Sequence, residues 1–344
     1  MVAPHIYPGH PLYIKNYPPQ TGENIIDCSN ITDNQNCMLD QVTIHQLELF
    51  LVAAKLKNFS RAADQMAISQ PAFSAQIIKL EKILGAPLFE RIGRRIELTE
   101  TGALFESYAQ RTLSTLREGK QAIDDMTTQV IGALRIGAST TIGNYILPRF
   151  LWTYRARYPG CSVEMMVGNT NQIEQALLRN EIDMALVEGP IQNVKRIATR
   201  LFRKDELVVI FSPRHPWKNR TTITLKELEA EPLIIRERGS GTRKVFMDAI
   251  EKASGSGKFN VAMELGATEA IKRSTEANVG VAVISASAIE REVKEKTLKM
   301  ARVHGCSMER RFNLALLKNK YVSNPLRAFA AILNPAEKLG DVIE

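Results

Sequence analysis

The 344-residue chain has little of what marks several common protein classes. It contains four cysteines, none of them in a C-x-x-C pair, so a disulfide framework or a zinc site is not expected. No apolar run approaches the about 20 residues that cross a bilayer. No signal-peptide pattern is recognisable at the start either. These absences predict a cytoplasmic protein with no membrane partner.

Motifs of catalysis and of cofactor binding are also missing. The chain holds no G-x-S-x-G, H-E-x-x-H or G-x-G-x-x-G run, and its five histidines are dispersed. We therefore expect no catalytic residue, no metal ligand and no cofactor. The sequence favours a protein that binds over one that catalyses.

The composition and the distribution of charge are more informative. Hydrophobic residues make up 44% and charged residues 24%, which is typical of a packed globular chain. The length suggests more than one domain. Of the net charge of +8, five units lie between Lys55 and Arg95, where eight basic residues stand against three acidic ones. Such a run is often only a solvated face, but it coincides here with a helical pair and so favours contacts with nucleic-acid phosphates.

The stretch from Phe59 to Ile77 predicts two helices joined by a tight turn. Ser60 and Ser69 are suitable N-caps, and Pro71 falls in the first turn of the second helix, where its missing N–H has no cost. Apolar residues recur behind it at helical spacing, so this helix has one buried face (Phe73, Ile77, Leu80 and Leu84). A capped helix with a polar leading end beside a short turn is the layout of a helix-turn-helix DNA reader.

A wing is predicted after this pair. Gly85 and Pro87 end the second helix, and two short strands follow at 88–91 and 95–98. The turn between them carries arginines that could enter a narrow minor groove. The residues expected to contact double-stranded DNA are Ser60, Arg61, Ser69, Gln70, Pro71, Ser74, Gln76, Lys79, Arg94 and Arg95.

The segments on either side of this module differ in character. Residues 1–40 show no periodicity and contain five prolines, so they are expected to be a disordered extension. Met38 offers an alternative start just before the helix that Thr43 opens; the other interpretation is a regulatory tail. On the far side, Thr99 begins a linker helix that is predicted to run to about residue 129. Its heptad spacing favours dimerisation over packing on its own domain (Ala109, Thr112, Leu116, Gly119, Ile123, Met126 and Val130).

From residue 131 to about 340 the pattern alternates between strands and helices. Strands are expected at 134–137, 162–167, 184–187, 206–212, 233–236, 262–265, 281–284 and 312–318. Helices are expected at 142–158, 170–180, 225–228, 241–253, 267–278 and 324–333. This alternation predicts a doubly wound α/β effector domain, and its length favours two lobes. The expected domains are therefore 1–40, 41–99, 100–130 and 131–340.

Ligands of doubly wound folds bind beyond the carboxyl ends of the strands. Three strand-to-helix turns there, 138–143, 168–170 and 238–243, offer hydroxyls, free amides and two guanidinium groups. Taken singly, each is ordinary helix capping; together they predict one cleft for a small anion. The residues expected to line it are Ser139, Thr140, Thr141, Asn169, Thr170, Glu188, Ser240, Thr242 and Thr268.

The residues from Thr43 to Gly102 resemble the LysR-type transcriptional regulators. The likeness rests on fixed offsets over about sixty residues, in Ser60–Ala63, Ser69–Ala72, Leu80–Glu81, Leu84–Gly85, Leu88–Arg91 and Leu98–Gly102. It continues more loosely in Leu134–Gly137, Ile182–Val187 and Asn278–Ala282. Within the family, the chain is most similar to the branch that includes regulators of carbon-fixation and of cysteine or sulfur operons.

The resemblance implies a winged helix-turn-helix, a linker helix and a two-lobed effector domain like a periplasmic binding protein. It also implies a homo-oligomer, usually a tetramer, and a coinducer that changes the DNA bend and the contact with RNA polymerase. By position, Gln70, Pro71, Ser74 and Arg94 would touch DNA, and Thr140, Thr141, Asn169 and Thr268 would line the cleft. Ala75 departs from the arginine of many members, so the resemblance assigns no base contact there.

These observations lead to one main hypothesis. The chain is expected to be a sequence-specific DNA-binding transcription regulator, controlled by a small, anionic metabolite. The alternative is a cytoplasmic solute-binding protein with no DNA role. The sequence names neither the effector, nor the promoter, nor the sign of regulation.

Overall fold

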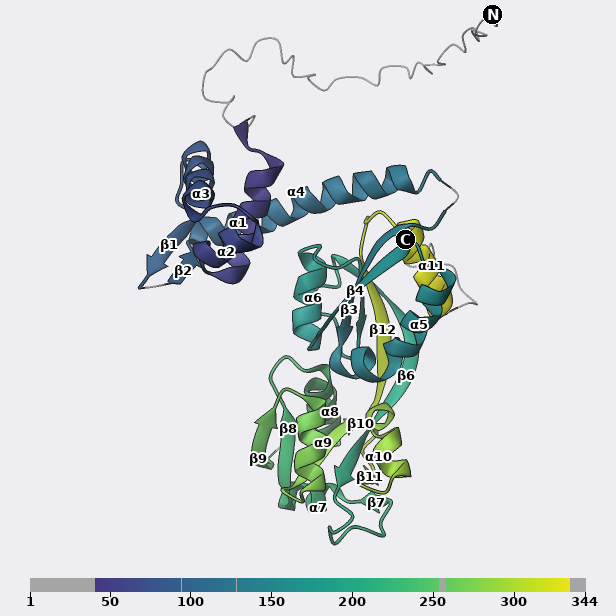
Figure 1. Cartoon of the computed structure of the whole chain (residues 1–344). Helices are drawn as coiled ribbons and strands as arrows, with labels where there is room; N and C mark the ends of the chain where they lie inside the picture. The colour runs from purple at the N-terminus through teal and green to yellow at the C-terminus, as the bar shows by residue number, and fades with distance from the viewer. Residues whose placement is uncertain (1–40, 94, 128, 254–257, 335–344) are drawn as a thin grey trace, which may run out of the picture.

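The computed structural model describes residues 41–93, 95–127, 129–253 and 258–334 (Figure 1). The predicted disordered extension, the start at Met38 and the wing residue Arg94 lie outside these ranges. In the described part of the chain, a small helical module and a two-lobed α/β body are connected by one long helix (Figure 1).

The helical module is the predicted winged helix-turn-helix. It comprises α1 (Ile44–Leu56), α2 (Phe59–Gln65), α3 (Gln70–Leu84), β1 (Phe89–Ile92) and β2 (Arg95–Leu98). Thr43 caps α1 in a capping box and Ser69 caps α3, as expected. Gly85 ends α3 at a φ of 68°, a left-handed conformation that glycine adopts without steric cost.

One prediction in this module is wrong: Ser60 does not cap α2. The cap is Asn58, whose side chain accepts a hydrogen bond from the Arg61 N–H. Ser60 is the second residue of the helix. Both residue types are good caps, and the extended backbone of Asn58 decides which one acts.

The module has its own hydrophobic core. The buried face of α3 is confirmed, because Phe73, Ile77 and Leu80 are all buried. The small side chains of Ala62 and Ala63 are buried as well, which lets α2 pass close to α3. Aromatic rings tie the wing to the helices, with ring centroids 5.4 Å apart for Phe50 and Phe89 and 5.3 Å for Phe59 and Phe89.

The connecting helix is α4 (Glu100–Asp124), capped by Thr99 as predicted. It ends at Asp124 rather than near residue 129, so Met126 and Val130 of the predicted heptad seam lie beyond the helix. Ala109, another seam position, is buried in the core of the DNA-binding module. The exposed apolar residues of α4 define what we call the α4 stripe: Leu104, Tyr108, Leu116 and Ile123.

The α/β body is built on a ten-stranded sheet with the path β4-β3-β5-β12-β6-β10-β8-β9. Off this path, β11 pairs with β6, and β7 pairs with β11. Lobe I contains β3 (Gly132–Ser139), η3 (Ile142–Ile146), α5 (Leu147–Arg157), β4 (Cys161–Gly168), α6 (Thr170–Leu178), β5 (Met184–Val187) and α11 (Asn324–Leu333). Lobe II contains β7 (Thr222–Ile223), α7 (Leu225–Ala230), β8 (Pro232–Arg236), α8 (Gly241–Lys252), β9 (Asn260–Leu265), α9 (Thr268–Glu276), β10 (Val281–Ser285), η4 (Ala286–Ala288), α10 (Glu290–Lys294) and β11 (Lys299–Val303).

Two long antiparallel strands join the lobes, β6 (Ile197–Phe211) and β12 (Glu309–Leu317) (Figure 1). Each lobe has its own core, in lobe I around Leu134, Tyr154 and Phe329 and in lobe II around Phe211, Phe246 and Val281. The predicted doubly wound, two-lobed fold is confirmed. No helix in the described ranges is long and apolar enough to cross a membrane.

Some element boundaries differ from the prediction. Strand β6 begins nine residues before position 206. Its first half was missed because it alternates half-buried and exposed residues instead of forming an apolar run. The expected helix 142–158 is interrupted: a π-helical turn, η3, precedes α5, and Pro148 stands in the first turn of α5. The short elements β7, β11 and α10 were not predicted.

The end of α4 is held against lobe I by Asp125. The Tyr321 hydroxyl and the Asn324 N–H each donate to Asp125 Oδ2 over 2.8 Å. Asn324 is the first residue of α11, so this carboxylate lies at a helix N-terminus, where the helix dipole stabilises negative charge. Gln121 adds hydrogen bonds to Asp125 Oδ1 and to the Ile131 carbonyl. This joint explains why α4 stops where it does.

Candidate functional site

The exposed face of α3 and its N-cap present five of the ten residues expected to contact DNA. Ser69, Gln70, Pro71 and Lys79 are exposed, and Ser74 is half-buried beside them. Gln70 Nε2 donates to Ser74 Oγ over 3.0 Å, which orients both side chains on this face. Amide and hydroxyl groups on a leading helix are the groups that read base edges in a major groove.

The other expected DNA contacts fall in three places. Ser60 and Arg61 are exposed on α2, and Arg95 is exposed at the start of β2. Gln76 is half-buried, and its Oε1 accepts from Nε2 of the buried Gln46 over 3.1 Å. The Gln76 side chain is therefore part of the packing between α1 and α3, a role that its position on α3 did not indicate.

The wing is held in a set position relative to α3 by a carboxylate that the sequence reasoning missed. Glu81 Oε1 accepts from the Leu88 N–H over 2.7 Å and from the Phe89 N–H over 3.2 Å. The Lys57–Glu97 ion pair, at 2.5 Å, joins β2 to the end of α1. Both strands of the wing are therefore anchored, β1 to α3 and β2 to the end of α1.

Between the lobes, Arg236 joins two of the expected effector residues. Its Nη2 donates to Thr140 Oγ1 of lobe I over 3.4 Å, and its Nη1 donates to Thr268 Oγ1 of lobe II over 3.5 Å. Arg236 is buried, and its charge is balanced by Glu237 at 2.8 Å. Its place at the carboxyl end of β8 was a signal that sequence reasoning could have used.

A second buried network centres on Arg310 of β12. Its Nε donates to Asp205 Oδ2 over 2.7 Å, its Nη1 to Thr242 Oγ1 over 2.9 Å and its Nη2 to Thr141 Oγ1 over 3.4 Å. The Glu188 carboxylate lies 3.3 Å from the guanidinium. Ser285 and Ser287 complete the set by donating to Asp205. Sequence reasoning found Thr141, Glu188 and Thr242 but missed Arg310 and Asp205.

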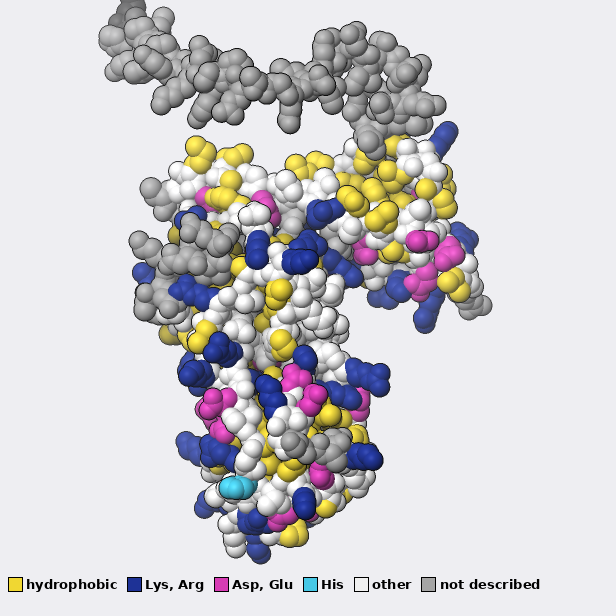
Figure 2. Space-filling view, turned by 180° about the vertical axis from the view of Figure 1, so that it is seen from behind, with side chains coloured by type: hydrophobic (Ala, Val, Ile, Leu, Met, Phe, Trp, Pro, Cys, Tyr) yellow, Lys and Arg dark blue, Asp and Glu magenta, His cyan; other side chains and the backbone are white. Residues whose placement is uncertain are grey.

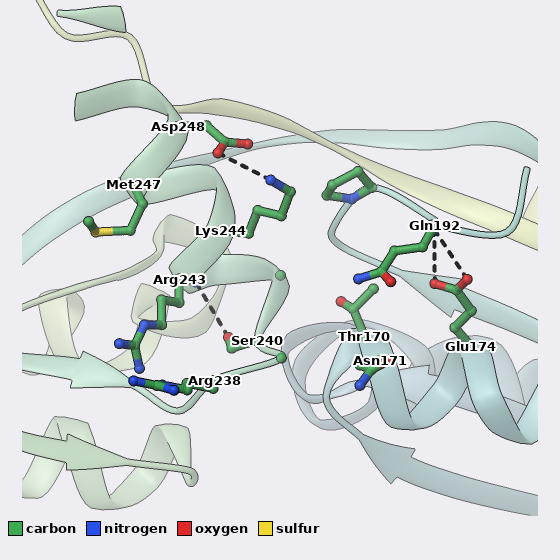
Figure 3. Close-up of a pocket in the computed structure, with 13 residues that line it drawn as sticks. Thr170, Asn171, Glu174, Gln192, Arg238, Ser240, Arg243, Lys244, Met247 and Asp248 are labelled. Atoms are coloured by element: carbon green, nitrogen blue, oxygen red, sulfur yellow. Dashed lines mark hydrogen bonds and ion pairs between the residues drawn. The ribbon is translucent and has the colours of Figure 1, made fainter. Parts of the chain in front are cut away.

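A cavity of about 470 Å³ opens beside these networks, between α6 and α8 (Figure 3). Of the expected effector residues, Thr170 and Ser240 line it, on opposite walls. Asn169 caps α6 and Ser240 caps α8, so both helix N-termini are directed toward this region. Ser139 is buried at the end of β3. Seven of the nine expected residues thus divide between the cavity and the two buried networks, and Ser139 and Asn169 belong to neither group.

The lining of the cavity carries three cations, Arg238, Arg243 and Lys244, against two carboxylates, Glu174 and Asp248, and Lys244 pairs with Asp248. Arg238 is exposed, and its side chain has no hydrogen-bond or ion-pair partner among the described residues. Arg243 lies next to it (Figure 3) and pairs with Glu264 over 2.7 Å. That pairing holds the pKa of Glu264 below its usual range. Glu174, also in the wall, is occupied by the Gln192 and Asn193 N–H groups. The arrangement can hold a small anion.

A third contact between the lobes lies on η3. The Tyr145 hydroxyl donates to Glu269 Oε1 over 2.5 Å, and Lys272 pairs with Glu269 and Glu292, each over 2.7 Å. Burial, and then the hydrogen bond with Glu269, raises the pKa of Tyr145. This hydrogen bond joins a π-helical turn of lobe I to lobe II. Whether it forms therefore depends on how the two lobes are arranged.

The described residues offer neither a metal site nor a reactive thiol. Within the described ranges, no three His, Cys, Asp or Glu side chains are grouped so as to hold a metal ion. Cys161 and Cys306 are buried free thiols. Burial raises the pKa of the Cys306 thiol, which makes its thiolate scarcer at neutral pH.

Comparison with known families decides what this architecture is. Residues 44–103 match the model of the bacterial regulatory helix-turn-helix proteins of the lysR family, and residues 127–337 match the LysR substrate binding domain. The chain belongs to the LysR family of transcription regulators. The hypothesis of a DNA-binding regulator with an effector domain is confirmed, and the alternative of a solute-binding protein with no DNA role is wrong. LysR proteins are regulators and not enzymes.

Relatives agree with the branch expected from the sequence. The chain is 37% identical to the uncharacterized HTH-type transcriptional regulator YeiE of Escherichia coli K12, over 86% of this chain and 98% of that protein. It is 34% identical to the HTH-type transcriptional activator CmpR of Synechocystis, over 85% and 94%. It is 32% identical to a probable RuBisCO transcriptional regulator of Trichormus variabilis, over 85% and 88%.

Solved structures show the same fold. CbnR, a LysR family transcriptional regulator, superposes with a TM-score of 0.64 at 21% identity, over 86% of this chain and all of that one. The CcmR regulatory domain of Synechocystis, in complex with 2-PG, superposes with a TM-score of 0.56 at 30% identity. That likeness covers 60% of this chain and 98% of the CcmR domain.

Proposed function

We propose that this LysR regulator contacts DNA through α3, the start of α2 and the wing. The residues in these roles are Ser60, Arg61, Ser69, Gln70, Pro71, Ser74, Lys79, Arg94 and Arg95. The basic run from Lys55 to Arg95 supports phosphate contacts on the same side. Gln76 acts here by holding α3 against α1 through Gln46.

We propose further that a small anionic metabolite bound in the α6–α8 cavity controls these contacts. The single observation that carries this proposal is Arg238, an exposed guanidinium that makes no side-chain hydrogen bond or ion pair within the described residues and lies beside Arg243 and two helix N-termini. The complex of CcmR with 2-PG supports it by analogy. A ligand that binds one lobe arrangement better than another shifts the population of arrangements.

The assembly is proposed to be a homo-oligomer, in line with the tetramer that the resemblance implies. The α4 stripe is one candidate contact between copies. The edge strands β4 and β9 are the others, because each exposes apolar side chains (Met165, Met166 and Val167 on β4; Val261 and Met263 on β9). Figure 2 shows apolar side chains on the surface of the DNA-binding module and of the α/β body.

We also propose the domain boundaries, a contact with RNA polymerase and a location in the cell. The domain division at 41–99, 100–130 and 131–340 follows the module, the connecting helix and the α/β body. Contact with RNA polymerase and a place in the cytoplasm follow from the role of a bacterial DNA-binding regulator.

Footprinting on the intergenic DNA upstream of the regulator's own gene tests the proposal. We expect protection that changes in extent when 2-PG or inorganic sulfate is added. Arg238→Ala should keep the ligand-free footprint and need at least tenfold more anion for the change. Arg291→Ala, which removes an exposed arginine on α10, is the matched control and should respond as the wild type does. If the footprint of Arg238→Ala changes at the same anion concentration as that of the control, the α6–α8 cavity is not the effector site.

A further inference from the structure

Three buried polar atoms at the lobe interface have no hydrogen-bond partner among the described residues. They are Ser139 Oγ, Thr170 Oγ1 and Glu188 Oε2. The three residues are 0%, 5% and 2% exposed. Native proteins pair more than about 90% of such groups, and leaving one unpaired costs about 1–3 kcal/mol. Three at one place therefore point to a binding function.

The three atoms belong to one site because the topology brings their strands together. β3 pairs with β4 and with β5, all in parallel, so Ser139, Thr170 and Glu188 follow neighbouring strands at the same sheet edge. Gly189, next to Glu188, lies so close to Gly241 that a Cβ there would meet the Gly241 Cα at 2.7 Å. Thr170 and Gly241 also line the α6–α8 cavity. We call the three atoms the inner subsite, because they lie where that cavity meets the buried networks.

The charged groups around the inner subsite indicate which kind of hydrogen-bond partner is missing there. Arg310 is the cation of this network, and it faces two carboxylates, Asp205 and Glu188. Asp205 is fully engaged, by Arg310 Nε and by the hydroxyls of Ser285 and Ser287. Glu188 receives only a 3.5 Å bond from Thr242 on Oε1 and a 3.3 Å ion pair without hydrogen-bond geometry on Oε2. A carboxylate oxygen is a hydrogen-bond acceptor, so Oε2 has the Arg310 charge nearby and still offers a place for a donor.

We infer that the inner subsite binds a hydrogen-bond donor on the effector, a hydroxyl or an ammonium group, while the anionic group of the effector faces Arg238. This inference rests on the proposed function and narrows it. The effector is then a small organic anion with a hydroxyl or amino substituent. An inorganic oxyanion such as sulfate offers only acceptors, so it would be held at Arg238 alone, leave Glu188 Oε2 without a donor and bind more weakly than such an effector.

The first test needs no ligand. Ser139→Ala removes a hydroxyl that has no protein partner, so its melting temperature should equal or exceed that of the wild-type full-length chain. Ser285→Ala is the matched control, because its buried hydroxyl donates to Asp205 over 2.8 Å. It should melt several degrees lower. Equal losses in the two variants would mean that the Ser139 hydroxyl has a structural bond, which overturns the inference.

The second test measures binding of propionate, lactate and alanine to the full-length chain by calorimetry. These probes share a three-carbon skeleton and carry hydrogen, hydroxyl and ammonium at C2. We expect lactate or alanine to bind at least tenfold more tightly than propionate, and the stronger of the two identifies the donor. Glu188→Met should reduce this ratio to about one, and Glu188→Gln, which keeps one acceptor, should give an intermediate value. Glu309→Gln, at an exposed carboxylate of β12, should keep the wild-type ratio.

The outcomes separate the inference from the proposed function. All three probes could bind with equal affinity, and Arg238→Ala could weaken the binding of each to the same extent. This result would support the anion site at Arg238 and overturn the inner subsite. If none binds, the inference fails, and the footprint with 2-PG or sulfate still decides the anionic effector. A ratio that Glu188→Met leaves unchanged also overturns the inference, provided that this variant melts as one cooperative unit.

Discussion

Asp183, at the start of β5, shows how a single residue joins three distant parts of lobe I. It accepts from the backbone N–H of Arg135 over 2.9 Å and from its Nη2 over 2.6 Å, and it pairs with Lys320 at 3.2 Å. Burial alone would raise the pKa of Asp183, but the Arg135 hydrogen bonds and the Lys320 charge hold it below the usual 3.8. Burial lowers the pKa of Lys320.

The lowered pKa of Asp183 has a definite sign for stability. The unfolded state binds the proton more tightly, so the contribution is present above the unfolded pKa of about 3.9 and is lost as pH falls through the folded value. Asp183→Asn should therefore unfold in urea with about 3 kcal/mol less free energy at pH 7, because Arg135 and Lys320 remain buried without it. The difference should narrow below pH 4. Asp124→Asn, in an exposed pair with Lys120, should cost less than about 1 kcal/mol.

Lys79 is the exposed cation of α3 and supports a second prediction at the residue scale. Lys79→Ala should weaken DNA binding about equally for specific and unrelated sequences and reduce the salt slope by about 1, because a phosphate contact is lost. Fluorescence anisotropy at several salt concentrations measures both quantities. Lys252→Ala, on α8 of the effector domain, should leave both unchanged. An unchanged slope in Lys79→Ala would move the phosphate contacts elsewhere.

At the scale of elements, the end of α4 is the informative case. Periodicity predicts that a helix exists, and the cap Thr99 confirms its start. Its end depends on Asp125, whose carboxylate is bound by Tyr321 and Asn324 almost 200 positions later. Local sequence carries no signal for such a contact. The same joint gives the linker helix its direction relative to lobe I.

Breaking this joint should uncouple ligand binding from DNA. Asp125→Ala removes the acceptor for Tyr321 and Asn324, so the effector-dependent change of the footprint should shrink at least fivefold while ligand affinity remains within twofold. Asp124→Asn serves again as the neighbouring control. Footprinting combined with calorimetry separates the two effects. A full response in Asp125→Ala would show that coupling runs through another contact.

At the scale of the whole molecule, the α4 stripe bears on assembly. Exposed Leu116 and Ile123 would be buried if two copies of α4 packed side by side. Ile123→Glu should therefore reduce the oligomer mass in analytical ultracentrifugation and weaken DNA binding by at least tenfold. Ser107→Glu, on another exposed face of α4, should leave the mass unchanged. Equal masses for both variants would exclude the stripe as the contact.

The fold of the whole molecule also shows which features could be predicted from the sequence. The caps at Thr43, Ser69 and Thr99, the buried face of α3 and the alternation of strands and helices were predicted, because capping and periodicity act within a few residues. The nine effector residues were chosen by one rule, the carboxyl ends of strands, and the fold places them in one region. Their roles stay predictions.

Only the tertiary structure decided how those residues are divided and what they lack. Arg310 meets Asp205 because the pairing of β12 with β6 sets these two residues opposite each other, 105 positions apart, and no local pattern encodes that register. The inner subsite exists because Gly189 and Gly241 let the lobes approach closely around Glu188. The sequence by itself therefore determined a LysR regulator with a DNA-reading helix. The long-range pairing of β6 and β12 decided where the α6–α8 cavity lies and which charges surround it.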